Sequence, residues 1–222
     1  MHDEQPATLM AHLKSSTDEA HEAAEAVPFN AAVMSGRISL EAYTAQLHAY
    51  QVIYGTLQDL ADAHDHPLIE HTWTGSDQPD RLGDDLKYLD PKATMRVPSA
   101  MNAATFLAHE LSAMALSDGP QLFGAIYVLT GAGLGGLVMT RHLQRALGLR
   151  DQGLSFYGAQ PQQRARNWKR FVQRANEFDL QPQHRASIVA SARTVFDGVA
   201  QILWAISDHL AIGLSHDQAG TV

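Results

Sequence analysis

The most informative segment of the chain is Leu122-Phe-Gly-Ala-Ile-Tyr-Val-Leu-Thr-Gly131-Ala-Gly133-Leu-Gly135-Gly136-Leu-Val-Met-Thr-Arg141. It is uncharged up to its last residue and has glycine at 131, 133, 135 and 136. Three kinds of structure use such spacings. Gly131-x-Gly133-x-x-Gly136 fits a dinucleotide-binding turn, and Gly131-x-x-x-Gly135 fits the contact face of paired membrane helices. The third is a bent helix that lies directly against a flat ligand.

The composition limits the class of protein. A chain of 222 residues suits one core, so we expect a single domain over 1–222, with an ordered core at about 7–212 and flexible tails at 1–6 and 213–222. The net charge of -8 argues against nucleic acid as a partner, because such binding depends on Lys and Arg. Without cysteine there is no thiolate-ligated haem, iron–sulfur cluster or cysteine zinc site, so a haem or metal would need His or carboxylate ligands.

The location of the protein is inferred from its apolar and charged segments. Acidic residues follow Met1 where a secretory signal would have Lys or Arg, and the chain therefore does not resemble an exported protein. Residues 122–139 are long enough to cross a bilayer only with strain, and no basic asymmetry flanks them. We therefore expect a cytoplasmic protein with no membrane partner, in which this segment is a buried helix.

Apolar residues at steps of three and four predict helices throughout the chain. Helices are expected over residues 7–26, from a cap at Ser39 to about residue 61, and after a possible cap at Ser99. Pro120, Pro161 and Pro182 each occupy a position typical of a first helical residue, and the last helix is long. No alternating strand of useful length is found. The prediction is an all-α, single-domain fold of six to eight helices.

The helical pattern decides against the dinucleotide turn. A doubly wound fold would need a second strand after Leu147, but residues 148–153 form a glycine-bordered turn. If the segment is helical, each glycine costs about 1 kcal/mol relative to alanine, so a close approach must require the glycines. Either another helix crosses tightly, or a planar ligand lies on the bare backbone.

The residues around His21 favour the planar ligand over the tight helix crossing. Small residues flank this imidazole, and the stretch containing Leu13, Lys14, Thr17, His21, Ala24 and Glu25 resembles the proximal helix of the heme oxygenases. The glycine run resembles the distal helix of the same family through Tyr127, Leu129, Gly131, Gly135 and Gly136. The Gly-Gly pair followed by Arg141-His142-Leu143 and Leu147-Gly148-Leu149 is most similar to the bacterial branch, which includes the enzymes that supply bacterial phytochromes.

The resemblance implies a function and a set of site residues. His21 would be the proximal iron ligand, with Glu25 one turn later, and Gly131, Gly135 and Gly136 would be the catalytic distal wall. Haem would be both cofactor and substrate, and dioxygen with electrons from a ferredoxin- or flavodoxin-type donor would open it to biliverdin, carbon monoxide and ferrous iron. A phytochrome is one possible receiver of the biliverdin. The other expected haem contacts are Lys14, Ala24, Tyr127, Lys169, Arg174 and Phe196.

Two of these assignments come with alternatives. The haem propionates need cations, and Lys169, Arg170 and Arg174 are candidates that also fit a solvated basic face. Phe171 and Phe196 would border the haem or belong to the core.

Some residues indicate other functions. Ala132 stands where the family has a polar residue, which leaves a non-catalytic protein that binds haem or a partner as the alternative function. A di-iron site would need two Glu-x-x-His units, and only Asp18-x-x-His21 is close to one. The histidines and acids at 62–66 and 70–71 form a loose metal motif or a solvated loop.

Overall fold

The computed structural model describes residues 8–117, 119–150, 152–158 and 160–213, and every regular element within them is a helix. The expected all-α fold is therefore confirmed. The expected tails lie outside the described residues, apart from Gly213. The elements in chain order are α1 (Leu9–Glu25), α2 (Pro28–Met34), α3 (Leu40–Asp62), α4 (Pro67–Thr72), α5 (Gln78–Leu89), α6 (Pro98–Ala115), α7 (Leu122–Ala132), the 3-10 turn η1 (Gly133–Gly135), α8 (Gly136–Leu147), α9 (Ser155–Gly158), α10 (Pro161–Ala175) and α11 (Pro182–His209).

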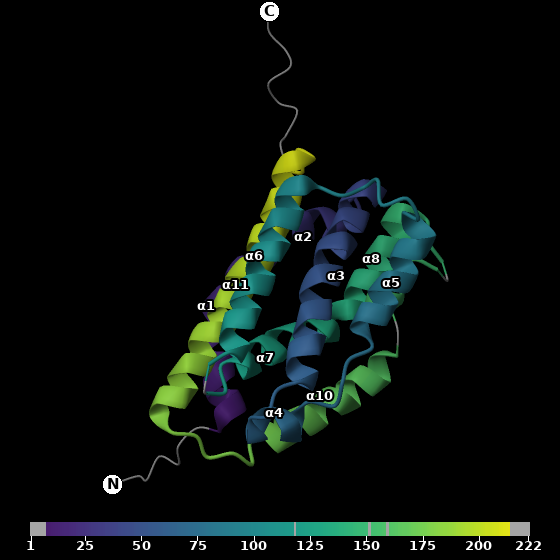
Figure 1. Ribbon diagram of the computed structural model, residues 1–222. Helices are drawn as coiled ribbons and strands as arrows, with labels where there is room; N and C mark the ends of the chain where they lie inside the picture. Colours follow the sequence, from purple (N-terminus) through teal and green to yellow (C-terminus); the bar gives the residue numbers. More distant parts are fainter. Residues whose placement is uncertain (1–7, 118, 151, 159, 214–222) are drawn as a thin grey trace, which may run out of the picture.

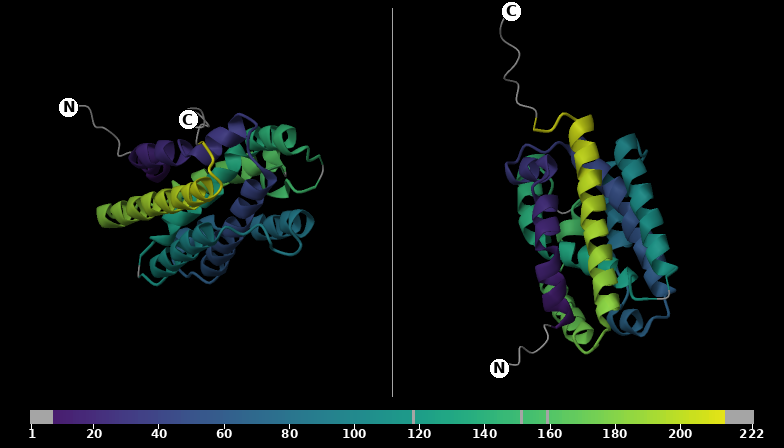
Figure 2. Two further views of the ribbon diagram at one scale, coloured as in Figure 1. Left: turned by 90° about the horizontal axis from the view of Figure 1, so that it is seen from above. Right: turned by 90° about the vertical axis from the view of Figure 1, so that its left-hand side faces the viewer.

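The long C-terminal helix α11 connects several helices of the bundle. It packs against α6, α7, α1, α2 and α3, and α3 packs in turn against α6 and α5. Figure 1 shows α6 and α11 running side by side, and Figure 2 shows α1 along the other side of α11. One apolar core therefore connects the N-terminal helix to the rest of the molecule.

Helix starts agree with the sequence signals in most places. The Ser39 hydroxyl accepts the N–H of Ala42 at 3.1 Å, and Pro161 and Pro182 are first helical residues. Two expectations were wrong. The helix expected after a cap at Ser99 begins two residues earlier, at Pro98, and the Ser99 hydroxyl donates to the carbonyl of Ala205 on α11 instead. The next helix begins at Leu122 and not at Pro120.

The glycine-rich segment is a broken helix. α7 ends at Ala132, η1 spans Gly133–Gly135, and α8 leaves at an angle of 59° between the segments Leu122–Gly135 and Val138–Leu147. Among the described residues no single helix has the length and apolar character to span a membrane, although this bent pair would meet both criteria together. The prediction of a bent helix is confirmed.

Helix α1 runs past this break. Near its start, the Met10 N–H donates to the Asn176 side chain after α10, and in its middle Arg193 of α11 donates twice to the Ser16 carbonyl, at 3.0 and 2.7 Å. The following helix, α2, contacts α8. Because α10 also contacts η1, α1 runs between an element that contacts the turn and an element that contacts α8 (Figure 2).

Candidate functional site

His21 is an accessible imidazole near the C-terminal end of α1. Its side chain is 52% exposed, and its ring meets that of Phe196 edge to face, with centroids 5.5 Å apart. Nε2 lies 3.6 Å from a Glu25 carboxylate oxygen, which is longer than a hydrogen bond. The structure therefore brings together three predicted site residues, with one side of the imidazole in contact with Phe196 and much of the rest accessible.

The four glycines of the broken helix face different surroundings. A Cβ added at Gly135 would meet no atom of the described residues within 4 Å, and one at Gly131 would lie 3.3 Å from the Trp168 ring. A Cβ at Gly136 would lie only 2.5 Å from the Tyr157 carbonyl oxygen of α9. Close packing thus explains Gly136, whereas packing does not explain Gly135.

Exposed apolar side chains lie next to Gly135. Leu134 is 44% exposed and Val138 is 51% exposed, which is unusual for large aliphatic residues beside a helix break. Together with a glycine that faces open space, they form an apolar surface without a covering side chain. A flat apolar ligand is the kind of molecule that such a surface can hold.

An aromatic stack borders the same region. Tyr127 lies 5.9 Å from Trp168, which stacks on Phe171 at 5.4 Å, and Phe171 stacks on Phe123 at 5.2 Å. Phe171, expected as either haem border or core, is almost fully buried in this stack. Trp168 is a site candidate that the sequence analysis did not identify, because its spacing matches an ordinary buried stripe.

The predicted propionate partners are dispersed. Lys14 is 76% exposed and pairs with Asp18 at 3.5 Å, and Lys169 is exposed on α10. Arg174 donates to the His71 carbonyl at 3.2 Å, which joins α10 to α4. The structure does not gather these three cations around one point.

Ala24 lies away from the exposed side of α1. It is 9% exposed, and its carbonyl accepts from the Asn30 amide at 3.0 Å. Its predicted haem contact stays a prediction, as does that of each residue above.

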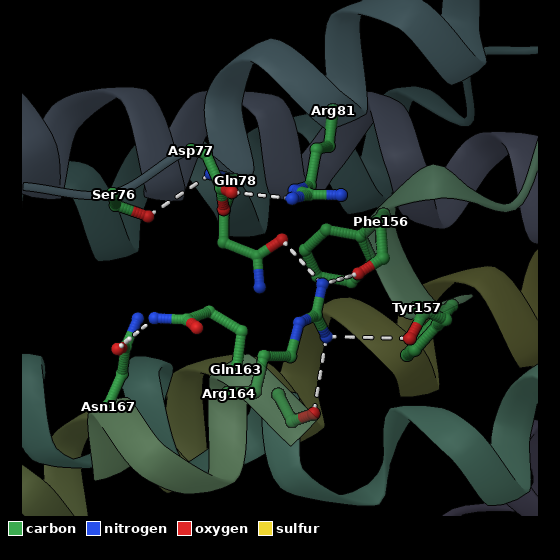
Figure 3. Close-up of polar contacts among 10 residues, drawn as sticks. Ser76, Asp77, Gln78, Arg81, Phe156, Tyr157, Gln163, Arg164 and Asn167 are labelled. Carbon is green, nitrogen blue, oxygen red and sulfur yellow. Dashed lines mark hydrogen bonds and ion pairs between the residues drawn. The ribbon is translucent and has the colours of Figure 1, made fainter. Parts of the chain in front are cut away.

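Polar groups bind the break from the side of α9 and α10 (Figure 3). Arg164 of α10 donates to the Gly133 carbonyl at 3.2 Å and to the Gln78 side chain at 3.3 Å, and burial lowers its pKa. On the same side, the Tyr54 hydroxyl donates to the Leu129 carbonyl at 3.0 Å. A cavity of about 470 Å³ adjoins these groups, and among its lining residues are Tyr54, Ile126, Leu129, Thr130, Gly133, Leu134, Arg164 and Trp168. Leu134 therefore borders both this cavity and the open surface at Gly135, and nothing in the local sequence indicated Arg164 or the cavity.

The loose histidine motif does not assemble a metal site. No group of three His, Asp or Glu side chains in the described part of the chain is placed to hold a metal ion. The His64 ring accepts the N–H of His66 at 3.1 Å, and His71 instead pairs with Glu177 at 2.8 Å. The di-iron alternative based on Asp18 and His21 has no support for the same reason.

Comparisons with known proteins agree with this fold. A family model described as heme oxygenase matches residues 7–204. The fold is similar to heme oxygenase-2 from Synechocystis, solved with heme and NO, with a TM-score of 0.84 and 19% identity over 94% of this chain and 89% of that one. It is also similar to heme oxygenase from Leptospira interrogans, with a TM-score of 0.76 and 20% identity over 89% of this chain and 99% of that one. No curated protein matches.

Proposed function

Because the chain belongs to the heme oxygenase family, we propose that it binds haem between α1 and the α7–α8 break and opens it to biliverdin, carbon monoxide and ferrous iron. The observation that carries the proposal is the pair formed by His21 and Gly135. One is a half-exposed imidazole on the helix that runs past the break, and the other is a glycine that no packing contact explains.

The residues present fit a haem group. A neutral imidazole is a common axial ligand of haem iron, and the His21 ring is accessible to act as one. Gly135 leaves the space into which a side chain would project, and Leu134 and Val138 offer exposed apolar surface beside it. These are the features that a flat, mostly apolar ring with one metal centre requires.

Each protein group has a defined task in this proposal. Bound haem would supply the iron at which dioxygen is reduced and the ring that is oxidised, with electrons from a ferredoxin- or flavodoxin-type donor. His21 would ligate through one ring nitrogen, and Glu25 would orient the ring through the other. Phe196 limits rotation of the imidazole. The bare backbone at Gly135 would keep side chains off the distal face, and the exposed Leu134 and Val138 would exclude water from it once haem is bound. Gly131, against which the Trp168 ring packs, stays a predicted part of the distal wall.

Protons and propionates would be handled by groups outside this apolar face. Ala132 brings no polar side chain, so protons would arrive through water held by backbone carbonyls or by Thr130. Lys14 and Lys169 stay the predicted propionate partners, whereas Arg174 would first have to release the His71 carbonyl. A phytochrome that accepts biliverdin is the further partner that the resemblance implies.

Titration with hemin, followed by ascorbate or a ferredoxin reductase system, tests the proposal. We expect a Soret band at one equivalent and then biliverdin. His21→Ala should abolish the native Soret band, and His12→Ala on the same helix should leave it intact. Absence of a Soret band in the unmodified protein, or an unchanged spectrum in His21→Ala, would refute the assignment.

A second candidate function follows from Ala132. Because this exposed residue has no side chain that can hold a water, a protein that binds haem without degrading it is the alternative. A stable Soret band with no biliverdin after reductant is added would favour that alternative over the enzyme.

A further inference from the structure

The 3-10 turn Gly133–Gly135 has little packing of its own. Two of its three residues are glycines, and none of the three is buried. Glycine also leaves the backbone more conformational freedom than any other residue. The position of this turn therefore depends on what binds its backbone groups.

Arg164 of α10 binds this backbone and joins it to α9. Its Nη1 donates to the Gly133 carbonyl at 3.2 Å and to the Tyr157 carbonyl at 3.5 Å, and its Nη2 donates to the Phe156 carbonyl and the Gln78 side chain (Figure 3). All four acceptors are neutral oxygens. The nearby Asp77 carboxylate pairs with Arg81 at 2.6 Å, so the Arg164 guanidinium serves to join backbone segments.

The short helix α9 is a firm support for this contact. At its start, the buried Asp85 carboxylate accepts the N–H groups of Ser155 and Phe156, both at 2.8 Å. At its end, Arg164 binds the carbonyls of Phe156 and Tyr157. A negative group at the N–H end and a positive group at the C=O end match the dipole of a helix.

The support acts on the side of the turn that faces α10. An added Cβ would lie 3.3 Å from Trp168 at Gly131 and 3.4 Å from Arg164 at Gly133, whereas one at Gly135 would meet nothing within 4 Å. Gly136 also rests against the Tyr157 carbonyl, where an added Cβ would come within 2.5 Å. Because Gly133 and Gly136 flank the open Gly135 in the chain, a shift of the Gly133 carbonyl also shifts the backbone at Gly135.

We infer that Arg164 is a positioning residue, which fixes the Gly133–Gly135 turn to α9 and thereby sets how closely the distal backbone approaches haem bound at His21. The second half of this inference rests on the proposed function. The first half concerns the haem-free protein. The planar guanidinium is suited to the task because its rigid fork reaches several acceptors at once, which a lysine ammonium does not.

Hydrogen exchange in the haem-free protein tests the first half. Arg164→Met should accelerate exchange of the amides between Gly133 and Val138 about tenfold. In this variant the turn can open locally without first breaking the contact to α9, so opening costs less free energy. Arg166→Met removes an exposed arginine of the same helix, whose contact is to Gln163, and should leave these amides unchanged. Arg164→Lys should be intermediate, and it carries the test if Arg164→Met does not fold.

Spectroscopy of the hemin complex tests the second half. Arg164→Met should shift the pH profile of the ferric Soret band and change the ratio of biliverdin isomers, and Arg166→Met should change neither. A purely structural role would lower the unfolding midpoint and leave the spectrum of the folded protein unaltered. Unchanged exchange in a folded Arg164 variant overturns the inference, and faster exchange with unchanged spectra and isomers overturns its second half. If the unmodified protein binds no hemin, the proposed function fails, while the exchange result still decides whether Arg164 holds the turn.

Discussion

Asp90, at the end of α5, is a buried carboxylate surrounded by hydrogen-bond donors. It accepts from His48 at 2.9 Å, from the N–H and hydroxyl of Thr94 at 2.9 and 3.0 Å, and from the N–H of Met95 at 2.8 Å. Burial alone would raise the pKa of Asp90, but these hydrogen bonds outweigh it and hold the pKa well below its ordinary value. The charged form is therefore the one that the fold stabilises.

Replacing this carboxylate should reduce stability in a pH-dependent way. Because the pKa of Asp90 is lowered in the folded state, its contribution is present above the unfolded pKa of about 4 and is lost as the pH falls below it. Asp90→Asn should lower the free energy of unfolding by about 2–4 kcal/mol at pH 7, and by less at pH 3. Urea denaturation at both pH values measures this. Asp59→Asn, at an exposed site on α3, is the control, and an equal loss for Asp90→Asn at both pH values would contradict the prediction.

Gly135 and Gly136 are adjacent but should respond oppositely to alanine. A methyl at Gly136 meets the Tyr157 carbonyl, so Gly136→Ala should cost about 1–3 kcal/mol in unfolding free energy. Gly135→Ala meets nothing in the described residues and should stabilise the protein by up to about 1 kcal/mol, yet weaken hemin binding. Denaturation and hemin titration of both variants measure the two effects. Tight hemin binding by Gly135→Ala would show that the haem does not lie on this face.

At the scale of elements, the attachment of α1 determines where His21 lies. Arg193 of α11 donates two hydrogen bonds to the Ser16 carbonyl in the middle of the helix. Removing them by Arg193→Ala should cost only about 1 kcal/mol, because the contact is exposed. We expect faster hydrogen exchange in α1 and weaker hemin binding, although Arg193 itself need not touch the haem. Thr194→Ala, at the next position of the same helix, should affect neither, and unchanged exchange in α1 would contradict the prediction.

Local signals predicted the helices well because each depends on neighbouring residues. Ser39 caps α3 and Pro161 begins α10 as their local sequence indicates. Ser99 is different, since the hydroxyl that resembles a cap binds Ala205 of another helix. The break within 122–141 was predicted from the density of glycine, but the particular role of each glycine depends on atoms from α9, α10 and α11.

The site was only partly predictable for the same reason. His21 and Glu25 stand on one helix and could be found together, whereas Phe196 came from family resemblance, and its contact with His21 joins α1 to α11. Arg164 could not be predicted, because its acceptors are backbone carbonyl oxygens and a side-chain amide that lies far away in the sequence. Every residue has a backbone carbonyl, so the sequence does not indicate which one an arginine binds. The ligand role of His21 stays a prediction.

At the scale of the whole molecule, ligand binding should raise the free energy of unfolding of the entire chain, because the protein has one core. Hemin at 100 times its dissociation constant should add about 2.7 kcal/mol, which corresponds to about 5–10 °C in Tm for a chain of this size. Far-UV circular dichroism should give the same midpoint as fluorescence of Trp73 and Trp168, which border one cavity, and of Trp204 on α11. Iron-free protoporphyrin, which His21 cannot ligate, should shift both midpoints less. Separate midpoints would contradict a single cooperative unit.

The close crossing at Gly124 restricts which part of the distal helix can move. A Cβ added there would lie 2.7 Å from the Ala192 nitrogen of α11 and 2.8 Å from the Ser191 Cβ, so the backbones of α7 and α11 are nearly in contact. The first turns of α7 are thereby immobilised against the longest helix of the bundle. A rigid, disc-shaped ligand can then enter only if the segment moves beyond Leu129. The Gly133–Gly135 turn is where the fixed first part of this segment joins a part that can adjust.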